Sequence, residues 1–276
     1  MSVFEECLKF VKESLEKRKE TAEKGPLLVI VSGPQGSGKS YTSALLGKAL
    51  ESEGLRSTVL SIDDFYLTHA DQLALQAKFP QNKLIQGRGL PGTHDLPLLK
   101  KVMETIVSNH TGSVEVPVYD KSKFNGQGDR AGTREVALPL DCVIMEGWFL
   151  GFGSGQTTST DRMNPELTQV DQWLKEYASL LWESPHHPKV MIKFATDDIK
   201  NVYKWRLQQE HQLVKQQGEG MSDEEVIKFV DRYMPCYELY YSSFCDVSHS
   251  EKGTLIIHID ENRQVQGIDN KMQQQQ

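Results

Sequence analysis

Two patterns alternate along the chain: apolar residues that recur at helical spacing, and unbroken apolar runs. Near the start, apolar side chains recur at helical spacing with charged residues between them. This spacing predicts an amphipathic helix within residues 1–24 that packs on the rest of the protein. Those side chains are Phe4, Cys7, Leu8, Val11 and Leu15. Directly afterwards, the run LLVIV at 27–31 is typical of a β-strand buried on both faces.

The same alternation continues toward the C-terminus. It predicts helices at 39–53, 98–109, 166–183, 198–217 and 221–244, and further strands at 57–64, 113–120, 141–148, 189–197 and 254–260. Most of these strands are too apolar to face water, so the pattern indicates an α/β fold with a parallel sheet covered by helices on both faces. We expect one domain over 25–262.

Polar and glycine-rich stretches separate these elements. Residues 121–135 are predicted to form a loop, and residues 151–165 a mobile excursion rich in Gly, Ser and Thr. The polar segment 263–276, which ends in four glutamines, is expected to be disordered.

Composition and charge narrow the class of protein. The chain has 276 residues, of which 38% are hydrophobic and 25% charged, enough to bury a sizeable core. A net charge of -7 argues against binding of nucleic acid or acidic lipid through a general positive field. No apolar run approaches a membrane span, and the four cysteines show no metal-binding or disulfide spacing. We expect a cytoplasmic protein, with nuclear access left open, and take a monomer as the default.

The segment between the first strand and the helix after it carries the clearest chemical signal. Residues 33–40 read GPQGSGKS and satisfy the pattern G-x-x-x-x-G-K-[ST]. Glycines let the backbone curl so that N–H groups converge on phosphate oxygens, and the helix N-terminus adds partial positive charge. The lysine would reach the β- and γ-phosphates of a nucleotide, and the serine hydroxyl would ligate Mg²⁺. The residues expected at the nucleotide are Gly33, Pro34, Gln35, Gly36, Ser37, Gly38, Lys39, Ser40 and Tyr41.

Acidic residues at strand ends indicate what the nucleotide is used for. In an open parallel sheet, ligands gather at the carboxyl ends of the strands, where Asp63, Asp64, Asp120 and Glu146 fall. Phosphoryl transfer to a hydroxyl needs one carboxylate that accepts the hydroxyl proton and another acid near the metal. Asp63 or Asp64 suits the first role, and Glu146 suits the second.

Arg206, in the predicted helix at 198–217, has two interpretations of equal weight. It is a candidate lid arginine that reaches over the nucleotide, and it is equally a partner for Glu210 one helical turn later.

At this point the sequence resembles a known family. GPQGSGKS at 33–40, SIDDFYLT at 61–68, LIQGRGLPGTHDLPLL at 84–99, VPVYDKSKFNGQGDRAG at 116–132, VIMEGWFLGF at 143–152 and MSDEEVIKFVDRYMPCYE at 221–238 are similar to segments of plant-type glycerate kinases and their fungal relatives. These belong to the phosphoribulokinase, uridine kinase and pantothenate kinase branch of P-loop kinases. The resemblance implies a three-layer P-loop NTPase fold with about five parallel strands, ATP as donor, Mg²⁺ as cofactor and a small hydroxylated acceptor.

The resemblance also implies roles for individual residues. It makes Asp63 the leading candidate for the catalytic base, with Asp64 close behind, and makes Glu146 the acid near the metal together with Ser40. Lys39 acts on the transferred phosphate, and Arg206 lies in the region of the lid helix. The acceptor side would be formed by Asp64, Tyr66, Arg88, His94, Asp95, Tyr119, Asp120, Lys121, Asp129 and Arg130.

Two alternatives to an active kinase stand beside this prediction. One is a P-loop switch protein, although the guanine-reading pattern N-K-x-D of GTPase switches is missing from the sequence. The other is a degenerate kinase that binds ATP without turnover, which the intact Lys39, Ser40, Asp63 and Glu146 disfavour. Glycerate is one acceptor among several that the sequence allows.

Overall fold

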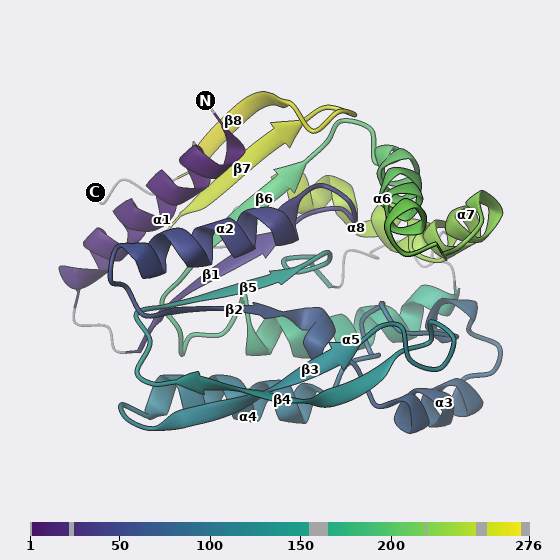
Figure 1. Cartoon of the computed structure of the whole chain (residues 1–276), viewed down its shortest axis with the longest axis horizontal. Coiled ribbons are helices and arrows are strands. Elements are labelled where there is room, and N and C mark those ends of the chain that lie inside the picture. Colours follow the sequence, from purple (N-terminus) through teal and green to yellow (C-terminus); the bar gives the residue numbers. More distant parts are fainter. Residues whose placement is uncertain (1, 22–24, 155–164, 219, 247–252, 272–276) are drawn as a thin grey trace.

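A computed structural model describes residues 2–21, 25–154, 165–218, 220–246 and 253–271. Among these residues, six strands form one sheet in the order β2-β5-β1-β6-β7-β8 (Figure 1). Strands β2, β5, β1, β6 and β7 run parallel, whereas β8 is antiparallel to β7. The bounds are β1 (Leu27–Ser32), β2 (Ser57–Ser61), β5 (Cys142–Gly147), β6 (Lys189–Ala195), β7 (Thr254–Ile259) and β8 (Val265–Lys271). The predicted α/β fold with about five parallel strands is confirmed.

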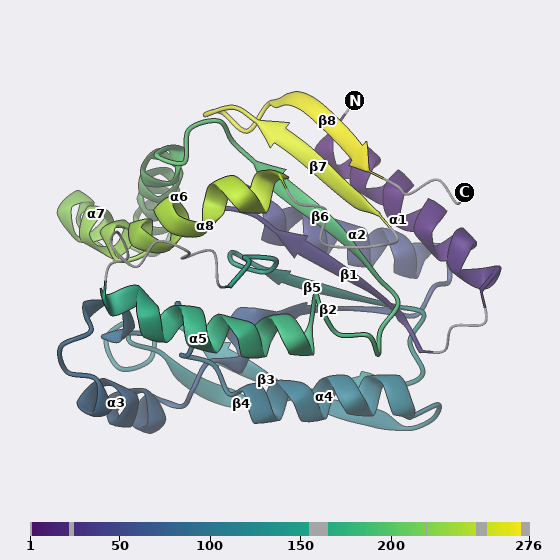
Figure 2. The same ribbon diagram turned by 180° about the vertical axis from the view of Figure 1, so that it is seen from behind.

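Helices cover both faces of this sheet. Figure 1 shows α1 (Val3–Lys19) and α2 (Lys39–Ser52) on one face, and Figure 2 shows α5 (Pro165–Leu180) and α8 (Met234–Asp246) on the other. The first strand is buried along its whole length, as its apolar run predicts. Helix α1 buries Cys7, Phe10, Val11 and Leu15, so the predicted apolar stripe does pack on the domain. Residues 1 and 22–24 of that prediction lie outside the described residues.

The remaining helices lie around the site. They are α3 (His69–Lys78), α4 (Leu96–Ser108), α6 (Asn201–Gln217) and α7 (Asp223–Asp231), with short 3₁₀-helices η1 (Ile62–Phe65) and η2 (Lys83–Ile85). Figure 1 shows α6 and α7 standing beyond the carboxyl ends of the parallel strands. In the part of the chain that the structure describes, no helix is both long and apolar enough to cross a lipid bilayer.

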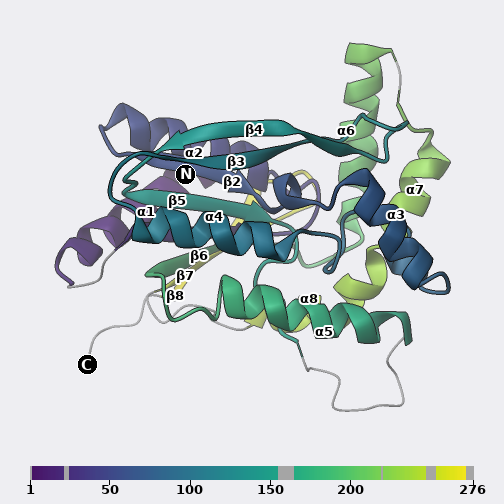
Figure 3. The same cartoon turned by 90° about the horizontal axis from the view of Figure 1, so that it is seen from below.

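The prediction of a loop over residues 121–135 is wrong from Asp129 onward. Asp129–Ala137 forms strand β4, which pairs antiparallel with β3 (Ser113–Asp120) in a separate two-stranded sheet. Figure 3 shows this hairpin beside β2, outside the parallel sheet. Most side chains of β4 are at least partly exposed, so backbone pairing holds the strand without an apolar pattern that the sequence could reveal. The predicted strand 113–120 is therefore not a member of the parallel sheet.

The C-terminal segment is also ordered where disorder was expected. Val265–Lys271 forms β8 at the edge of the sheet, hydrogen-bonded to β7. Its residues are all partly buried or exposed, and edge strands tolerate such polar residues because one of their sides faces solvent. The prediction of a disordered tail is wrong for these residues, and 272–276 lie outside the described residues.

The predicted helix at 221–244 is broken over these described residues into α7 and α8. Pro235 stands in the first turn of α8, where a residue without an N–H is tolerated although it cannot continue the preceding helix. The break places Arg232 and Tyr233 at the corner between the two helices. The predicted mobile excursion at 151–165 has its residues 155–164 outside the described residues.

Candidate active site

The phosphate loop connects β1 to α2, as the sequence predicts. Gly36 and Gly38 have φ of 81° and 97°, in the left-handed region that favours glycine. The glycines also permit close packing, because a Cβ at Gly33 would lie 2.6 Å from Cβ of Phe194 and one at Gly36 would lie 2.5 Å from Cβ of Trp205. Side chains at either position would push the loop away from β6 or α6, so the observed curl depends on glycine.

Lys39, Ser40 and Glu146 come together beside this loop. The hydroxyl of Ser40 donates a hydrogen bond to Oε2 of Glu146 at 3.0 Å, and the hydroxyl of Ser61 donates to Oε1 at 2.5 Å. Burial lowers the pKa of Lys39, while Glu146 and Asp63 oppose that shift. A buried carboxylate next to a hydroxyl at the start of a helix is an oxygen donor set that suits Mg²⁺. The residues present therefore fit both a nucleotide phosphate and its metal ion.

Asp63 lies in η1, directly after β2. Its Oδ1 accepts a hydrogen bond from the hydroxyl of Tyr66 at 2.8 Å, and its Oδ2 is 2.5 Å from Nζ of Lys121. Burial raises the pKa of Asp63, but the charge of Lys121 and the hydrogen bonds from Lys121 and Tyr66 outweigh it and lower the pKa to about 2. The carboxyl group is therefore ionised at neutral pH.

Asp64 has a different environment from its neighbour. Burial raises the pKa of its carboxyl group, while the backbone of Ser61 and the charge of Arg134 lower it in part. Arg134 belongs to the β3–β4 hairpin and donates to the backbone oxygen of Val59 at 2.6 Å. Of the two acids, Asp63 is the one that interacts with both Lys39 and Lys121.

His94 packs against the ring of Tyr66. The two rings stack with centroids 4.5 Å apart. Tyr177 accepts the N–H of Gly92, so its own proton is available for Nδ1 of His94 at 2.8 Å. Burial lowers the pKa of His94 to about 3, although the charge of Asp63 raises it. The ring is therefore neutral at neutral pH and holds Tyr66 in place.

Several predicted acceptor-side residues hold the surrounding loops together. Arg130 forms an ion pair with Asp95 at 2.7 Å, Asp129 accepts the N–H of His69 at 2.9 Å, and Asp120 accepts the N–H of Ser122 at 2.9 Å. In the structure these acids and Arg130 are occupied by local partners.

Arg88 organises the segment 121–128. Its Nη1 donates to the backbone oxygens of Gly126, at 2.5 Å, and Gln127, and its guanidinium lies over the ring of Tyr119 at 5.8 Å. Because Lys121 lies in the same segment, the position of Arg88 affects the position of Lys121, which is the partner of Asp63.

Arg206 takes the pairing interpretation in the structure. Its Nη2 lies 3.6 Å from Oε2 of Glu210, its Nη1 donates to Gln209 at 2.8 Å, and its guanidinium lies over Phe229 at 5.3 Å. Contact with ATP stays a prediction.

Two contacts to the phosphate loop were missed in the sequence. The N–H of Gln35 donates to the hydroxyl of Tyr237 at 3.0 Å, and Nε of Arg263 donates to the backbone oxygen of Gly36 at 2.6 Å. Tyr237 was assigned only to a helix and Arg263 to a disordered tail. No local pattern in the sequence could have identified either contact.

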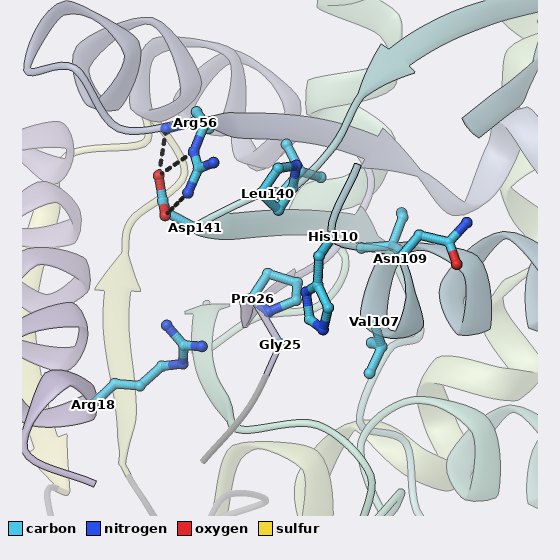
Figure 4. Close-up of a pocket in the computed structure, with 11 residues that line it drawn as sticks. Arg18, Gly25, Pro26, Arg56, Val107, Asn109, His110, Leu140 and Asp141 are labelled. Atoms are coloured by element: carbon cyan, nitrogen blue, oxygen red, sulfur yellow. Dashed lines mark hydrogen bonds and ion pairs between the residues drawn. The ribbon is translucent and has the colours of Figure 1, made fainter. Parts of the chain in front are cut away.

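A separate cavity lies at the other ends of the strands. It has a volume of about 260 Å³ and is lined by residues that include Arg18, Arg56 and Asp141. Figure 4 shows the carboxylate of Asp141 bound to the side chain and backbone N–H of Arg56, with distances of 2.7–3.1 Å. None of the predicted site residues lines this cavity, and Asp141 precedes β5 whereas Glu146 lies near its carboxyl end. The candidate active site is the open edge beside the phosphate loop.

The phosphate loop, the acid beside its serine and the second acid at the end of β2 define a P-loop phosphotransferase. No model of a known protein family matches the chain. The chain is 46% identical over 275 residues to a Saccharomyces cerevisiae protein named "Probable ATP-dependent kinase TDA10", covering 96% of this chain and 95% of that protein. It is 36% identical over 247 residues to the chloroplastic D-glycerate 3-kinase of Arabidopsis thaliana, covering 86% of this chain and 53% of that one.

A solved structure gives the same result. The D-glycerate 3-kinase from Cryptococcus neoformans superposes with a TM-score of 0.87 and 34% identity, covering 98% of this chain and 99% of that one. The chain therefore belongs to the family of ATP-dependent P-loop kinases that includes these D-glycerate 3-kinases, and it is an ATP-dependent small-molecule kinase. Membership of this family favours the kinase over the nucleotide-dependent switch protein.

Proposed function

We propose that the protein transfers the γ-phosphoryl group of ATP to a hydroxyl group of D-glycerate, as a monomer in the cytoplasm. The observation that carries this proposal is the pairing of Asp63 with Lys121, which puts a proton acceptor next to a cation at the edge that holds the phosphate loop. D-glycerate needs both groups, because it has hydroxyls to activate and a carboxylate to bind. Two relatives named D-glycerate 3-kinases support the same acceptor.

In this reaction an acceptor hydroxyl oxygen forms a bond to the γ-phosphorus while the bond from that phosphorus to the bridging oxygen of ADP breaks. The hydroxyl proton passes to the carboxylate of Asp63, and ADP leaves. The transition state is loose, so orientation and charge contribute more than strong basicity. A carboxylate with a pKa of about 2 is therefore adequate, because its main task is to orient the hydroxyl and receive the proton late.

Charge on the phosphate chain would be balanced by Lys39 and by Mg²⁺ held near Ser40 and Glu146. The metal ion supplies electrostatic stabilisation of the transferred group when it is bound. Glu146 is hydrogen-bonded by Ser40 and Ser61, which fixes the direction of its carboxylate.

Lys121 is the proposed partner of the acceptor carboxylate. Its side chain is 56% exposed although it reaches Asp63, so the ammonium is accessible to a ligand that approaches from solvent. Arg88 stands behind it and holds the backbone of the same segment. A carboxylate on Lys121 would bring the acceptor hydroxyls close to Asp63.

An acceptor panel tests this proposal. ADP release is measured by a coupled assay with D-glycerate, L-glycerate, pantothenate, uridine and a sugar acid. D-glycerate is expected to give the largest kcat/KM, because it is a small molecule that carries both a carboxylate for Lys121 and hydroxyls for Asp63. Turnover with another acceptor and none with D-glycerate would refute the proposed substrate while leaving the kinase assignment intact.

The pH dependence provides a second test. Because the pKa of Asp63 is lowered to about 2, the carboxylate is ionised above that pH and turnover should not fall through Asp63 between pH 8 and pH 5. Replacing Lys121 by Met removes the charge and hydrogen bond that lower this pKa, so the acid limb of the kcat profile is expected to move to higher pH. Lys123→Met is the control, because Lys123 lies two residues after Lys121 in the same segment and its Nζ donates to the backbone oxygen of Arg130. An unchanged acid limb in Lys121→Met would contradict the pairing as the cause.

A further inference from the structure

Three buried aromatic side chains connect the two halves of the site. Trp148, Tyr233 and Tyr237 are 3%, 2% and 1% exposed, and we call them the aromatic hub. The ring of Trp148 contacts both tyrosine rings edge to face, with centroids 5.1 Å apart in each pair. Trp148 follows directly after β5, which carries Glu146, whereas the tyrosines come from the corner between α7 and α8 and from α8 itself. The hub therefore joins the central sheet to the C-terminal helices.

On the donor side, the hub binds the phosphate loop through Tyr237. The N–H of Gln35 donates to the Tyr237 hydroxyl at 3.0 Å. The N–H of Ser37 donates to the backbone oxygen of Pro34 at 3.1 Å, which closes a turn around Gln35 and Gly36. Tyr237 thereby fixes the outer side of the turn from which the loop continues to Lys39.

On the acceptor side, the hub binds the backbone on either side of the Arg88 peptide. The backbone oxygen of Arg88 accepts hydrogen bonds from the Tyr233 hydroxyl at 3.2 Å and from Nη2 of Arg232 at 2.6 Å. Nε1 of Trp148 donates to the backbone oxygen of Gly89 at 2.8 Å. A Cβ at Gly89 would lie 1.8 Å from the Tyr233 hydroxyl, so glycine is required for this approach.

The hub affects the position of Lys121 through two successive contacts. A backbone fixed at Arg88 fixes the base of its side chain, whose guanidinium holds the backbone oxygens of Gly126 and Gln127. Those residues close the segment that begins with Lys121, the partner of Asp63. Among the described residues, no other group of side chains is hydrogen-bonded to both the phosphate loop and the Arg88–Gly89 backbone.

We propose that the aromatic hub sets the alignment of donor and acceptor, with Tyr237 as the positioning residue for the ATP loop and Tyr233, helped by Arg232, as the positioning residue for the acceptor segment. The acceptor part of this inference rests on the proposed function. In this proposal the hub side chains act on the two substrates indirectly. They act through Gln35 and through Arg88, so each affects the affinity for one substrate and leaves the other nearly unchanged.

Tyrosine-to-phenylalanine variants test the hub, because they keep the ring packing and remove only the hydroxyl. Tyr237→Phe leaves the N–H of Gln35 without its partner, and we expect the dissociation constant of ADP by calorimetry and the KM of ATP to rise about tenfold. The KM of D-glycerate should stay near the wild-type value. The double variant Arg232→Met/Tyr233→Phe removes both donors to the Arg88 oxygen, and we expect the reverse, a KM of D-glycerate about tenfold higher with little change for ATP.

Tyr240→Phe is the matched control. Tyr240 lies on the same helix as Tyr237 and is fully buried, and its hydroxyl donates to Asp171 at 2.9 Å rather than to the phosphate loop or the Arg88 backbone. It should lower the thermal midpoint of unfolding without changing either KM. The proposal is overturned if Tyr237→Phe binds ADP as tightly as wild type, or if either hub variant raises both KM values equally. A wild-type enzyme that ignores D-glycerate refutes the proposed acceptor instead, and the ADP measurement then decides on the hub by itself.

Discussion

The variant Asp63→Asn is expected to lower kcat by about 100- to 10,000-fold, the range typical for loss of a catalytic base. Asparagine has nearly the same shape, and its carbonyl oxygen still accepts the Tyr66 hydroxyl that Asp63 now accepts at 2.8 Å. The neutral amide cannot accept the hydroxyl proton as the carboxylate does, and the ion pair with Lys121 is lost. Binding of ATP should persist, because the phosphate loop is unchanged. Steady-state kinetics and calorimetry with ADP measure the two effects separately.

Asp64→Asn is the informative companion to this variant. The Asp64 carboxyl lies one residue further along η1, where burial raises its pKa and Arg134 of the hairpin opposes the shift. A proton acceptor at Asp63 predicts that Asp64→Asn retains far more turnover than Asp63→Asn. If Asp64→Asn is the inactive variant, the base is the other acid. If both variants lose ADP affinity equally, neither residue acts on the proton and both support the loop.

The sequence predicted best what short segments determine by themselves. The curl at 33–40 follows from its glycines and from the strand and helix that flank it, and Ser40 and Glu146 meet because β1 and β5 are neighbours with parallel registers. Buried parallel strands can be recognised in the sequence by their unbroken apolar runs. The carboxyl ends of such strands have to lie at one edge of the sheet, so the sequence alone places Asp63 and Glu146 near each other.

Contacts between distant residues could not be predicted in this way. Gln35 and Tyr237 are separated by 202 residues, and Gly36 and Arg263 by 227. No periodicity connects such pairs, and Arg263 lies in a polar segment whose strand is held by backbone pairing. The basic residues of the predicted acceptor side show the same difficulty. Arg88, Lys121 and Arg130 were equivalent in the sequence, whereas the structure gives them different partners, namely backbone oxygens, Asp63 and Asp95.

The variant Lys39→Met is expected to weaken ADP and ATP binding by about 30- to 4,000-fold. Removing one partner of a buried, hydrogen-bonded charge pair costs about 2–5 kcal/mol, and about 1.4 kcal/mol corresponds to a factor of ten. Methionine keeps the length of the side chain, so the loop is not opened by a cavity. Lys48→Met on the exposed side of the same helix is the control and should bind ADP like wild type.

The same variant is expected to make the ligand-free protein more stable. Burial lowers the pKa of Lys39, with Glu146 and Asp63 only partly opposing it. The charged form is therefore disfavoured in the folded state relative to the unfolded chain, and this penalty is present at every pH below the folded pKa. Methionine removes the penalty, so urea unfolding without nucleotide should require more denaturant. Lower stability together with lost binding would instead mean that the ammonium stabilises the fold. Higher stability together with lost binding would identify Lys39 as a group whose unfavourable burial is retained because it binds phosphate.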